Sequence, residues 1–449
     1  MNGLTRCLSV GVLALVASTW KLWTPQAVFP QVPLIRAACD WPGWLDWGCL
    51  AVLVASAVTM LFVARRGWLG RGSYVGLAVS LSGFFVLDQH RLQPWAWQFF
   101  LLAVLLSLAD DDTARRGWRW LVIGIYFWSA VSKLDFTFCH EQGPALLAGL
   151  RRAMGLRGLP NPWTEALDVV GSVGIALSEL GVAVLLMWPR ARWLGLWGAT
   201  IMHVALLAAL GPLGLNHSLS VLLWNAFFLV QNWLLFRATA AERPVSGETF
   251  PAQIRQWWRD LATWPASRTN RLALGTILAA MTWPVLEPLG YCDHWLAWAV
   301  YSARAETVRI STNSWYTGIL PGPNWRLHGL EEQESLNTLS IGEWSLATLG
   351  VPVYPNERFQ LGVVSTVLAT VKPYYVIVEG VRSLGEGRVS AASSTLQPRY
   401  ACVCVVSARR RMVNGRFERV VKPNDLSTEL DRYTINAHPR MTTYRVTPK

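Results

Sequence analysis

Long apolar runs separated by short polar segments occupy the first 300 residues of the chain. Nine of these runs equal or approach the ~20 residues that a helix needs to cross a bilayer. The pattern therefore predicts about nine transmembrane helices, at Leu8–Trp23, Trp44–Val63, Tyr74–Leu87, Trp95–Leu108, Trp120–Phe138, Ala166–Trp188, Trp193–Leu210, Leu219–Phe236 and Leu272–Leu289. The first run could instead be a cleaved signal peptide, because Arg6 precedes it and Ala17 and Ser18 lie near its end.

The pattern changes near Tyr301. The runs Thr307–Ile310, Tyr374–Val378 and Tyr400–Val406 are rich in β-branched and aromatic residues and are separated by Gly, Pro and Asn, which is typical of strands. We therefore predict an all-α polytopic membrane bundle over residues 1–300, followed by a small β-rich extramembrane domain over residues 301–449.

Composition supports a membrane protein. Of the 449 residues, 52% are hydrophobic and only 15% are charged, whereas soluble domains usually carry about a quarter charged residues. The 26 tryptophans fit the same class, because indole rings collect at membrane–water boundaries. The net charge of +12 does not indicate a nucleic-acid partner, since most of the cationic residues lie in short loops between apolar runs.

The distribution of Lys and Arg among the loops predicts the orientation. Alternate loops carry fifteen cationic residues and the remaining four carry six. Because cationic loops stay in the cytoplasm, the N-terminus is expected inside and the C-terminal domain outside. The richer set is Arg6, Arg65, Arg66, Arg71, Arg115, Arg116, Arg119, Arg190, Arg192, Arg237, Arg243, Arg255, Arg259, Arg268 and Arg271.

Two segments depart from a simple serpentine. Ile254–Trp264 places its apolar and Trp residues mostly on one side, with Arg255 and Arg259 beside them, which predicts a helix lying in the cytoplasmic interface. Cys139–Trp163 contains Gly, Pro and three Arg on the expected outer side. We expect this second segment to dip back toward the bilayer or to cap a cavity.

Four ionisable residues lie within or beside the apolar runs, where a mid-bilayer charge costs about 3 kcal/mol. Glu179 is near mid-depth of its run, Lys133 and His203 are in the outer halves of theirs, and His90 lies in the outer loop Asp88–Arg91. We predict that Lys133, His90, His203 and Glu179 form a catalytic site in one outward-facing cavity. No two histidines have a metal-ligand spacing, so no metal site is predicted.

Each of these residues also has a purely structural interpretation. Lys133 could extend its ammonium group to the interface, and Glu179 could hold a neighbouring helix by a hydrogen bond. His203 could be a packing histidine, and His90 could simply lie among the headgroups. On the catalytic interpretation, burial removes the hydration of the Lys133 ammonium and favours a neutral amine, which could deprotonate a weakly acidic apolar substrate such as a quinol. A carboxylate close to Lys133 would favour the charged lysine instead.

The segment Tyr126–Asp135 (YFWSAVSKLD) resembles the helix that carries the catalytic lysine of vitamin K-dependent γ-carboxylase, within the wider HTTM family of membrane domains. Lys133, directly before Leu134 and Asp135, matches the base of that family. Asp88–His90 is similar to its Asn-His pair, and the stretch from His203 to Asn225 more loosely to its later His…Gly helices. Ser132 stands where the family has a further lysine, and Phe136–Phe138 replaces the expected Asp-Trp.

The resemblance implies a quinol-dependent carboxylase, a carbon–carbon lyase. Lys133 would deprotonate a cofactor similar to vitamin K hydroquinone, oxygen would convert the cofactor into a strong base, and a substrate glutamate would then lose a proton and capture carbon dioxide. His90 would assist oxygenation or carboxylation. The lipid bilayer and an exported protein or peptide would be the partners.

Two other functions remain open from the sequence. A DoxX/MauE-like membrane accessory would support the maturation or redox balance of exported proteins without catalysis, although the seven cysteines form no CxxC pair. A transporter would use Glu179 and His203 as a proton relay near the midplane, although we find no inverted repeat.

Overall fold

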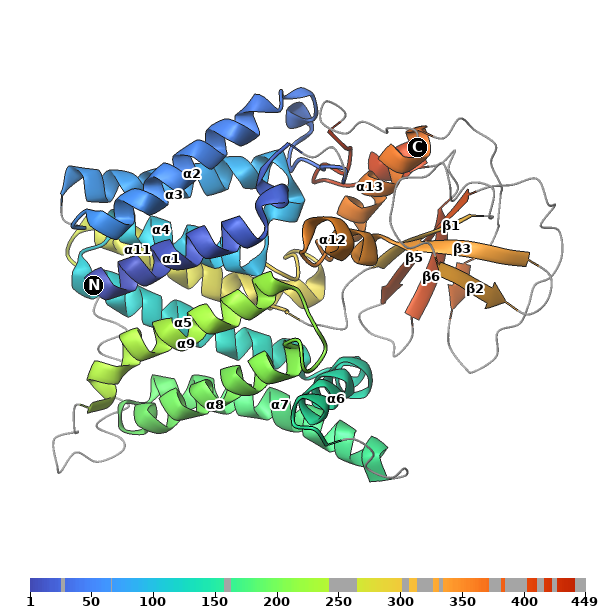
Figure 1. Ribbon diagram of the computed structural model, residues 1–449. Coiled ribbons are helices and arrows are strands. Elements are labelled where there is room, and N and C mark those ends of the chain that lie inside the picture. Colours follow the sequence, from blue (N-terminus) through green and yellow to red (C-terminus); the bar gives the residue numbers. More distant parts are fainter. Residues whose placement is uncertain are drawn as a thin grey trace.

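Helices form most of the protein in the computed structural model, and Figure 1 shows them running roughly parallel or antiparallel to one another. The structure describes residues 1–25, 29–65, 67–156, 163–241, 265–300, 307–312, 326–330, 334–370, 381–383, 402–409, 416–421 and 426–440. The predicted interfacial helix Ile254–Trp264 lies outside the described residues.

The helices of the first 300 residues pack as neighbours along the chain and also across it. α5 packs against α7, α7 against α8 and α8 against α9, while α1 packs against both α2 and α9. Their bounds are α1 (Asn2–Ser18), α2 (Trp44–Phe62), α3 (Trp68–Leu87), α4 (Pro94–Leu108), α5 (Asp111–Lys133), α6 (Gly143–Ala153), α7 (Trp163–Met187), α8 (Arg192–Leu210), α9 (Leu219–Ala241) and α11 (Arg268–Thr282).

Six helical segments of the described chain are long and apolar enough to cross a membrane, which indicates a multi-pass membrane protein. The predicted number of nine spans is therefore wrong. α1 has 17 residues and α4 has 15, which is short for a bilayer crossing. α5 begins with a charged turn and is long and apolar enough for a crossing only together with the bent segment Phe138–Ala153. The six spans are Trp44–Phe62, Trp68–Leu87, Ala166–Met187, Pro189–Leu210, Leu219–Arg237 and Arg268–Leu289.

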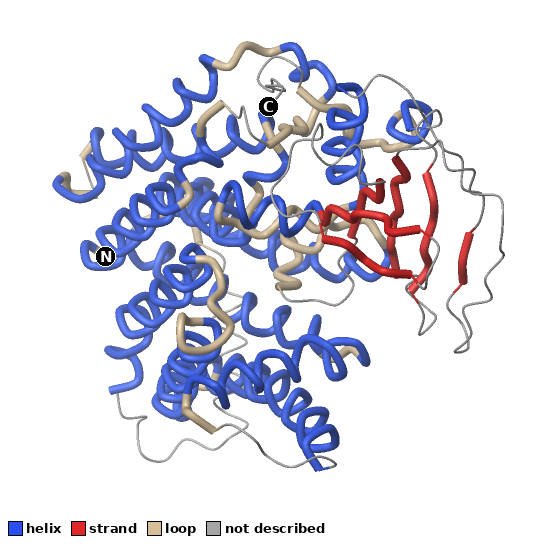
Figure 2. Tube along the Cα trace, turned by 45° about the vertical axis from the view of Figure 1, so that its right-hand side comes forward, coloured by secondary structure: helices blue, strands red, loops and turns tan. Residues whose placement is uncertain are grey.

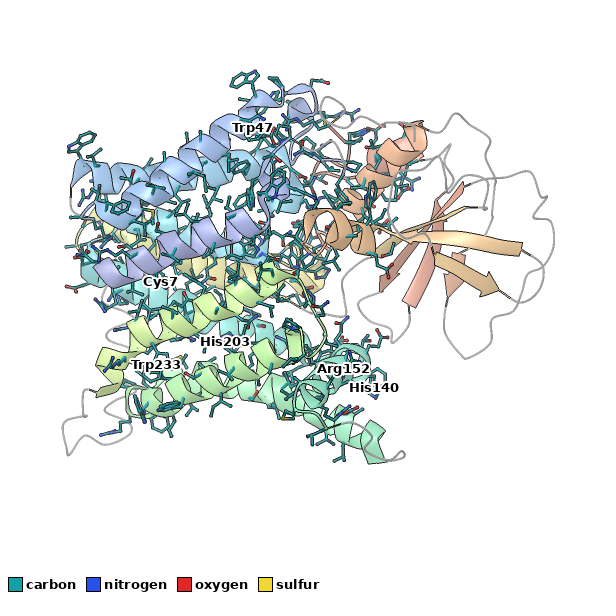
Figure 3. The ribbon with its side chains drawn as sticks, in the orientation of Figure 1. Cys7, Trp47, His140, Arg152, His203 and Trp233 are labelled. Atoms are coloured by element: carbon teal, nitrogen blue, oxygen red, sulfur yellow. The ribbon has the colours of Figure 1, made fainter. Side chains whose placement is uncertain are left out.

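Exposed tryptophans mark both ends of these helices. Trp44 and Trp47 lie at the start of α2, and Trp68 lies at the start of α3, which follows α2 after a short loop. Because α2 and α3 are joined by that loop and pack together, their first residues lie at opposite ends of the bundle. Figure 3 places Trp47 at the end of α2 that faces the C-terminal region. Exposed tryptophans at both ends are typical of helices that end at the two membrane interfaces.

The C-terminal region does not support the β-rich domain predicted from the sequence, so the predicted fold class is wrong. Val308 and Ser340 are the strand residues whose side chains the structure describes. The other described side chains after residue 306 lie on α12 (Ile341–Leu349), α13 (Glu357–Thr370) and α14 (Leu426–Leu430) and on their connections. The fold is therefore mostly helical, with six candidate membrane spans.

The backbone of this region pairs in six short stretches, drawn in red in Figure 2. All pairs are antiparallel and the order is β2-β3-β1-β5-β6-β4, with Ile310 opposite both Leu339 and Cys404. The stretches are β1 (Thr307–Thr312), β2 (Arg326–Leu330), β3 (Glu334–Ser340), β4 (Val381–Ser383), β5 (Cys402–Arg409) and β6 (Arg416–Val421). The predicted strand Tyr374–Val378 lies outside the described residues.

α12 and α13 pack directly against the first 100 residues. The ring of Trp344 lies 4.8 Å from that of Phe29, and the ring of Phe359 lies 5.1 Å from that of His90. α13 contains Val363, Val364 and Thr366 and is nevertheless helical. β-branched residues fit any buried, packed surface, so their presence in this region does not by itself indicate strands.

A buried ion cluster holds the segment around Arg440 on the helical body. Asp46 of α2 pairs with Arg91 (Oδ1 to Nη2, 2.5 Å) and with Arg440 (Oδ2 to Nη1, 2.8 Å), and all three side chains are fully buried. Arg91 also donates from Nε to the carbonyl of Leu22 at 2.7 Å. The cluster thus joins segments that are almost 400 residues apart.

Candidate functional site

A cavity of about 290 Å³ lies among α5, α7, α8 and α9 and brings three of the four predicted residues together. Lys133, Glu179 and His203 all line it, together with apolar side chains such as Leu206 and Phe228. Figure 3 labels His203 between the ribbons of α8 and α9. Three ionisable side chains from three helices therefore share one largely apolar cavity.

The local sequence explains why Lys133 lies at the cavity wall. Asp110 caps the start of α5 by accepting the Thr113 N–H at 2.8 Å, and the helix ends at Lys133. Asp135 then accepts the N–H of Thr137 at 2.9 Å, and the chain turns by 89° into the next helical segment. The Leu-Asp pair that follows the lysine therefore shapes the turn that ends this helix.

Lys133 is buried and paired. Its Nζ lies 2.7 Å from Oε2 of Glu179 and also donates to Oγ of Ser129 at 2.5 Å. Ser129 in turn donates to Oε1 of Glu179 at 3.1 Å. Lys133 is only 5% exposed and Glu179 only 7%, so the lysine does not extend to an aqueous interface. A carboxylate at this distance favours the charged ammonium, which argues against a free amine in the resting protein.

A second set of hydrogen-bonded polar side chains surrounds His203. Its Nε2 lies 2.7 Å from the hydroxyl of Tyr126, and its Nδ1 lies 2.8 Å from Oδ1 of Asn225. Asn232 donates from Nδ2 to the Tyr126 hydroxyl at 2.6 Å. The imidazole also stacks on Phe228, with ring centroids 5.0 Å apart. His203 is thus held in one orientation within the wall.

The segment after the 89° bend forms one side of the cavity. Gln142 and Leu146 line the cavity. Of the two roles expected for Cys139–Trp163, these contacts favour capping a cavity. α6 can approach α7 this closely because residue 143 is glycine; a Cβ there would collide with Ser172.

The C-terminal region contributes to the cavity wall through Pro352, and Trp295 and Val300, which precede this region, line the cavity as well. The carbonyl of Pro352 accepts from Nε2 of Gln93 at 3.3 Å and lies 3.1 Å from Nε2 of His90. The predicted β-rich region therefore supplies part of the cavity wall through non-strand residues.

His90 is not among the residues that line the cavity. Its ring is fully buried between Phe29 and Phe359, and Ser345 lies 3.2 Å from its Nε2. Burial lowers the pKa of His90 to about 4, so the imidazole is neutral at physiological pH. Next to it, burial raises the pKa of Asp88 to about 6, although its Oδ1 accepts two backbone N–H groups.

These two pKa shifts have opposite effects on how the free energy of unfolding changes with pH. Between about pH 4 and pH 6 the folded protein holds a proton on Asp88 that the unfolded chain releases, so this contribution falls as pH rises. Over the same range the unfolded chain protonates His90 and the folded protein does not, so this contribution rises.

Asp88→Asn is therefore expected to reveal the His90 contribution alone. The free energy of unfolding of the variant minus that of the unchanged protein should grow, as the pH rises from 4.5 to 6, by up to about 1.4 kcal/mol per pH unit. Thermal unfolding of the detergent-solubilised protein across this range measures the difference. The exposed Asp40→Asn serves as control, and parallel pH profiles for Asp88→Asn and the unchanged protein would contradict the assignment.

The sequence did not single out several residues of the site. Tyr126 and Ser129 appeared only as part of the quoted motif, and nothing in the sequence pointed to Asn232. The spacing of Tyr126, Ser129 and Lys133 at i, i+3 and i+7 places three polar groups on one face of an apolar helix, which was a usable signal. Within the described part of the chain, no group of three or more His, Cys, Asp or Glu is arranged to hold a metal ion.

Comparison of the chain with family models, with curated proteins and with solved structures finds no significant match.

Proposed function

We propose that the protein is a membrane enzyme that removes a proton from a lipid-soluble hydroxylated substrate, such as a reduced quinone. The observation that carries the proposal is the pairing of Lys133 with Glu179, at 2.7 Å, in the wall of a largely apolar cavity. A buried ion pair is costly to desolvate and contributes little net stability, so its position beside a ligand-sized cavity favours a chemical role.

The pair divides the acid–base work between two groups. Glu179 receives the proton of the substrate hydroxyl, and the Lys133 ammonium stabilises the resulting oxyanion. The hydroxyl and carboxylate thereby become an oxyanion and a carboxylic acid, while the lysine stays protonated. This assignment makes Glu179 the base in place of a neutral lysine, because Glu179 lies within hydrogen-bonding distance of the Lys133 Nζ.

The resemblance of Tyr126–Asp135 to γ-carboxylases extends the proposal. On this basis the cofactor is a quinol similar to vitamin K hydroquinone, and the reaction is the oxygen-dependent carboxylation of glutamate in an exported protein or peptide. The loops that carry Arg65 to Arg71 and Arg190 to Arg192 are cytoplasmic on this proposal, because cationic loops stay inside, and over six spans this places the C-terminal region outside.

The proposal is tested by assaying the purified protein with reduced 2-methyl-1,4-naphthoquinone, oxygen, labelled carbon dioxide and a glutamate-rich peptide. We expect quinone epoxide and labelled peptide, both of which should disappear when the quinol is omitted. Epoxide without labelled peptide would retain the quinol chemistry and remove the carboxylase assignment. A folded protein that forms neither product would overturn the proposal in favour of an accessory or transport role.

A further inference from the structure

We infer that Tyr126, acting with His203, is a second proton acceptor in the same cavity and receives the proton of the second hydroxyl of the quinol. The inference rests on the proposed function and adds to it the group that meets the second hydroxyl of the ligand. Three observations carry it: the tautomer of His203, the unused lone pair of Tyr126 and the direction of the Lys133 side chain.

The hydrogen bonds around His203 determine its tautomer. Asn225 donates from Nδ2 to the carbonyl of Val221 at 2.9 Å, so its Oδ1 faces His203 as an acceptor. Nδ1 of His203 must therefore carry the proton, and Nε2 is left with a lone pair. Tyr126 can only donate to that lone pair. The tyrosine hydroxyl proton thus already points at a base 2.7 Å away.

The Tyr126 oxygen can accept one more hydrogen bond. It receives one from Asn232 and donates to His203, which leaves one lone pair of the hydroxyl free. A ligand hydroxyl that donates there can pass its proton to Tyr126 while Tyr126 passes its own proton to Nε2 of His203. The products are a ligand oxyanion and an imidazolium, so the charges balance.

Asn225 makes this transfer depend on the ligand. An amide holds the imidazole in place but carries no negative charge that would stabilise an imidazolium, unlike the carboxylate found behind many catalytic histidines. The ligand oxyanion is then the group that stabilises the protonated His203. His203 acts through Tyr126 and is a positioning and proton-holding residue.

The two proposed proton acceptors, Glu179 beside Lys133 and Tyr126, lie about one helical turn apart along α5. Nζ of Lys133 bonds to the hydroxyl and the carbonyl of Ser129, so the lysine side chain runs back along α5 toward Tyr126. Ser129 is three residues from Tyr126, which corresponds to about 4.5 Å of helical rise. Both acceptors line the same cavity, so one aromatic ring with hydroxyls on opposite edges can reach both.

The test measures binding instead of turnover. Anaerobic calorimetric titrations compare 2-methyl-1,4-naphthoquinol with its two monomethyl ethers. The unchanged protein should bind each ether about fivefold more weakly than the diol, because each ether lacks one hydrogen-bond donor. Tyr126→Phe should bind one of the ethers as tightly as the diol and still discriminate against the other. Tyr74→Phe, which removes a buried hydroxyl from α3, should discriminate against both.

His203 is tested through the same ratio of affinities. His203→Gln should reduce discrimination against the ether that Tyr126→Phe no longer recognises, and the double variant should show no further loss, because the two residues act in one chain. A general structural loss would weaken the diol and both ethers alike. Full discrimination in Tyr126→Phe would overturn the inference and leave the proposed function standing. If the folded protein binds no quinol, both fail.

Discussion

Lys133→Met is expected to lower quinol-dependent turnover by at least about 100-fold, the range that positioned acid–base groups usually contribute. The substitution removes the ammonium that lies 2.7 Å from Glu179, so a substrate oxyanion loses its counter-charge. Rates of epoxide formation at saturating quinol measure the effect. Lys21→Met is the matched control, because Lys21 is exposed on the 3-10 helix Trp20–Trp23 and far along the chain from the cavity.

Loss of folding must be separated from loss of chemistry. Lys133→Met alone leaves Glu179 buried without its cation, which is costly. The double variant Lys133→Met/Glu179→Leu removes both charges and should restore thermal stability while remaining inactive. Glu179→Gln should be inactive as well, because an amide cannot receive the substrate proton. Turnover within about threefold of the unchanged protein in Lys133→Met would remove the pair from the mechanism.

Asp46→Asn is expected to lower the free energy of unfolding by about 3–5 kcal/mol, the usual result of breaking a buried ion pair from one side. Asp46 lies between Arg91 and Arg440, and none of the three side chains is exposed. The substitution leaves two buried guanidinium groups without a carboxylate. Thermal unfolding in detergent measures the loss, which should be accompanied by release of the segment around Arg440 in limited proteolysis.

The control for this prediction is Asp40→Asn, at an exposed aspartate six residues earlier in the chain. It should unfold at the same temperature as the unchanged protein. An Asp46→Asn variant that also unfolds at that temperature would mean that the cluster does not hold the C-terminal segment on the body.

Hydropathy was sufficient to identify a membrane protein and to locate most of its helices, because the free energy of moving a side chain from water into lipid depends on its residue type. It overestimated the number of spans, since α1, α4 and α5 are apolar where they face other helices, and burial in protein cannot be distinguished from burial in lipid by composition. The predicted β-rich domain was wrong as well, since β-branched residues also occur in buried helices such as α13.

The position of Lys133, Glu179 and His203 within apolar runs singled them out in the sequence, and the structure brings these three residues into one cavity. The direction in which each helix faces was not readable, because it depends on how α5, α7, α8 and α9 rotate to pack. Only the tertiary structure therefore brought Glu179 to Lys133, added Tyr126, Asn225 and Asn232, and placed His90 among aromatic rings away from the cavity. Composition along the chain determined the solvent of each segment, and packing between segments determined which polar groups meet.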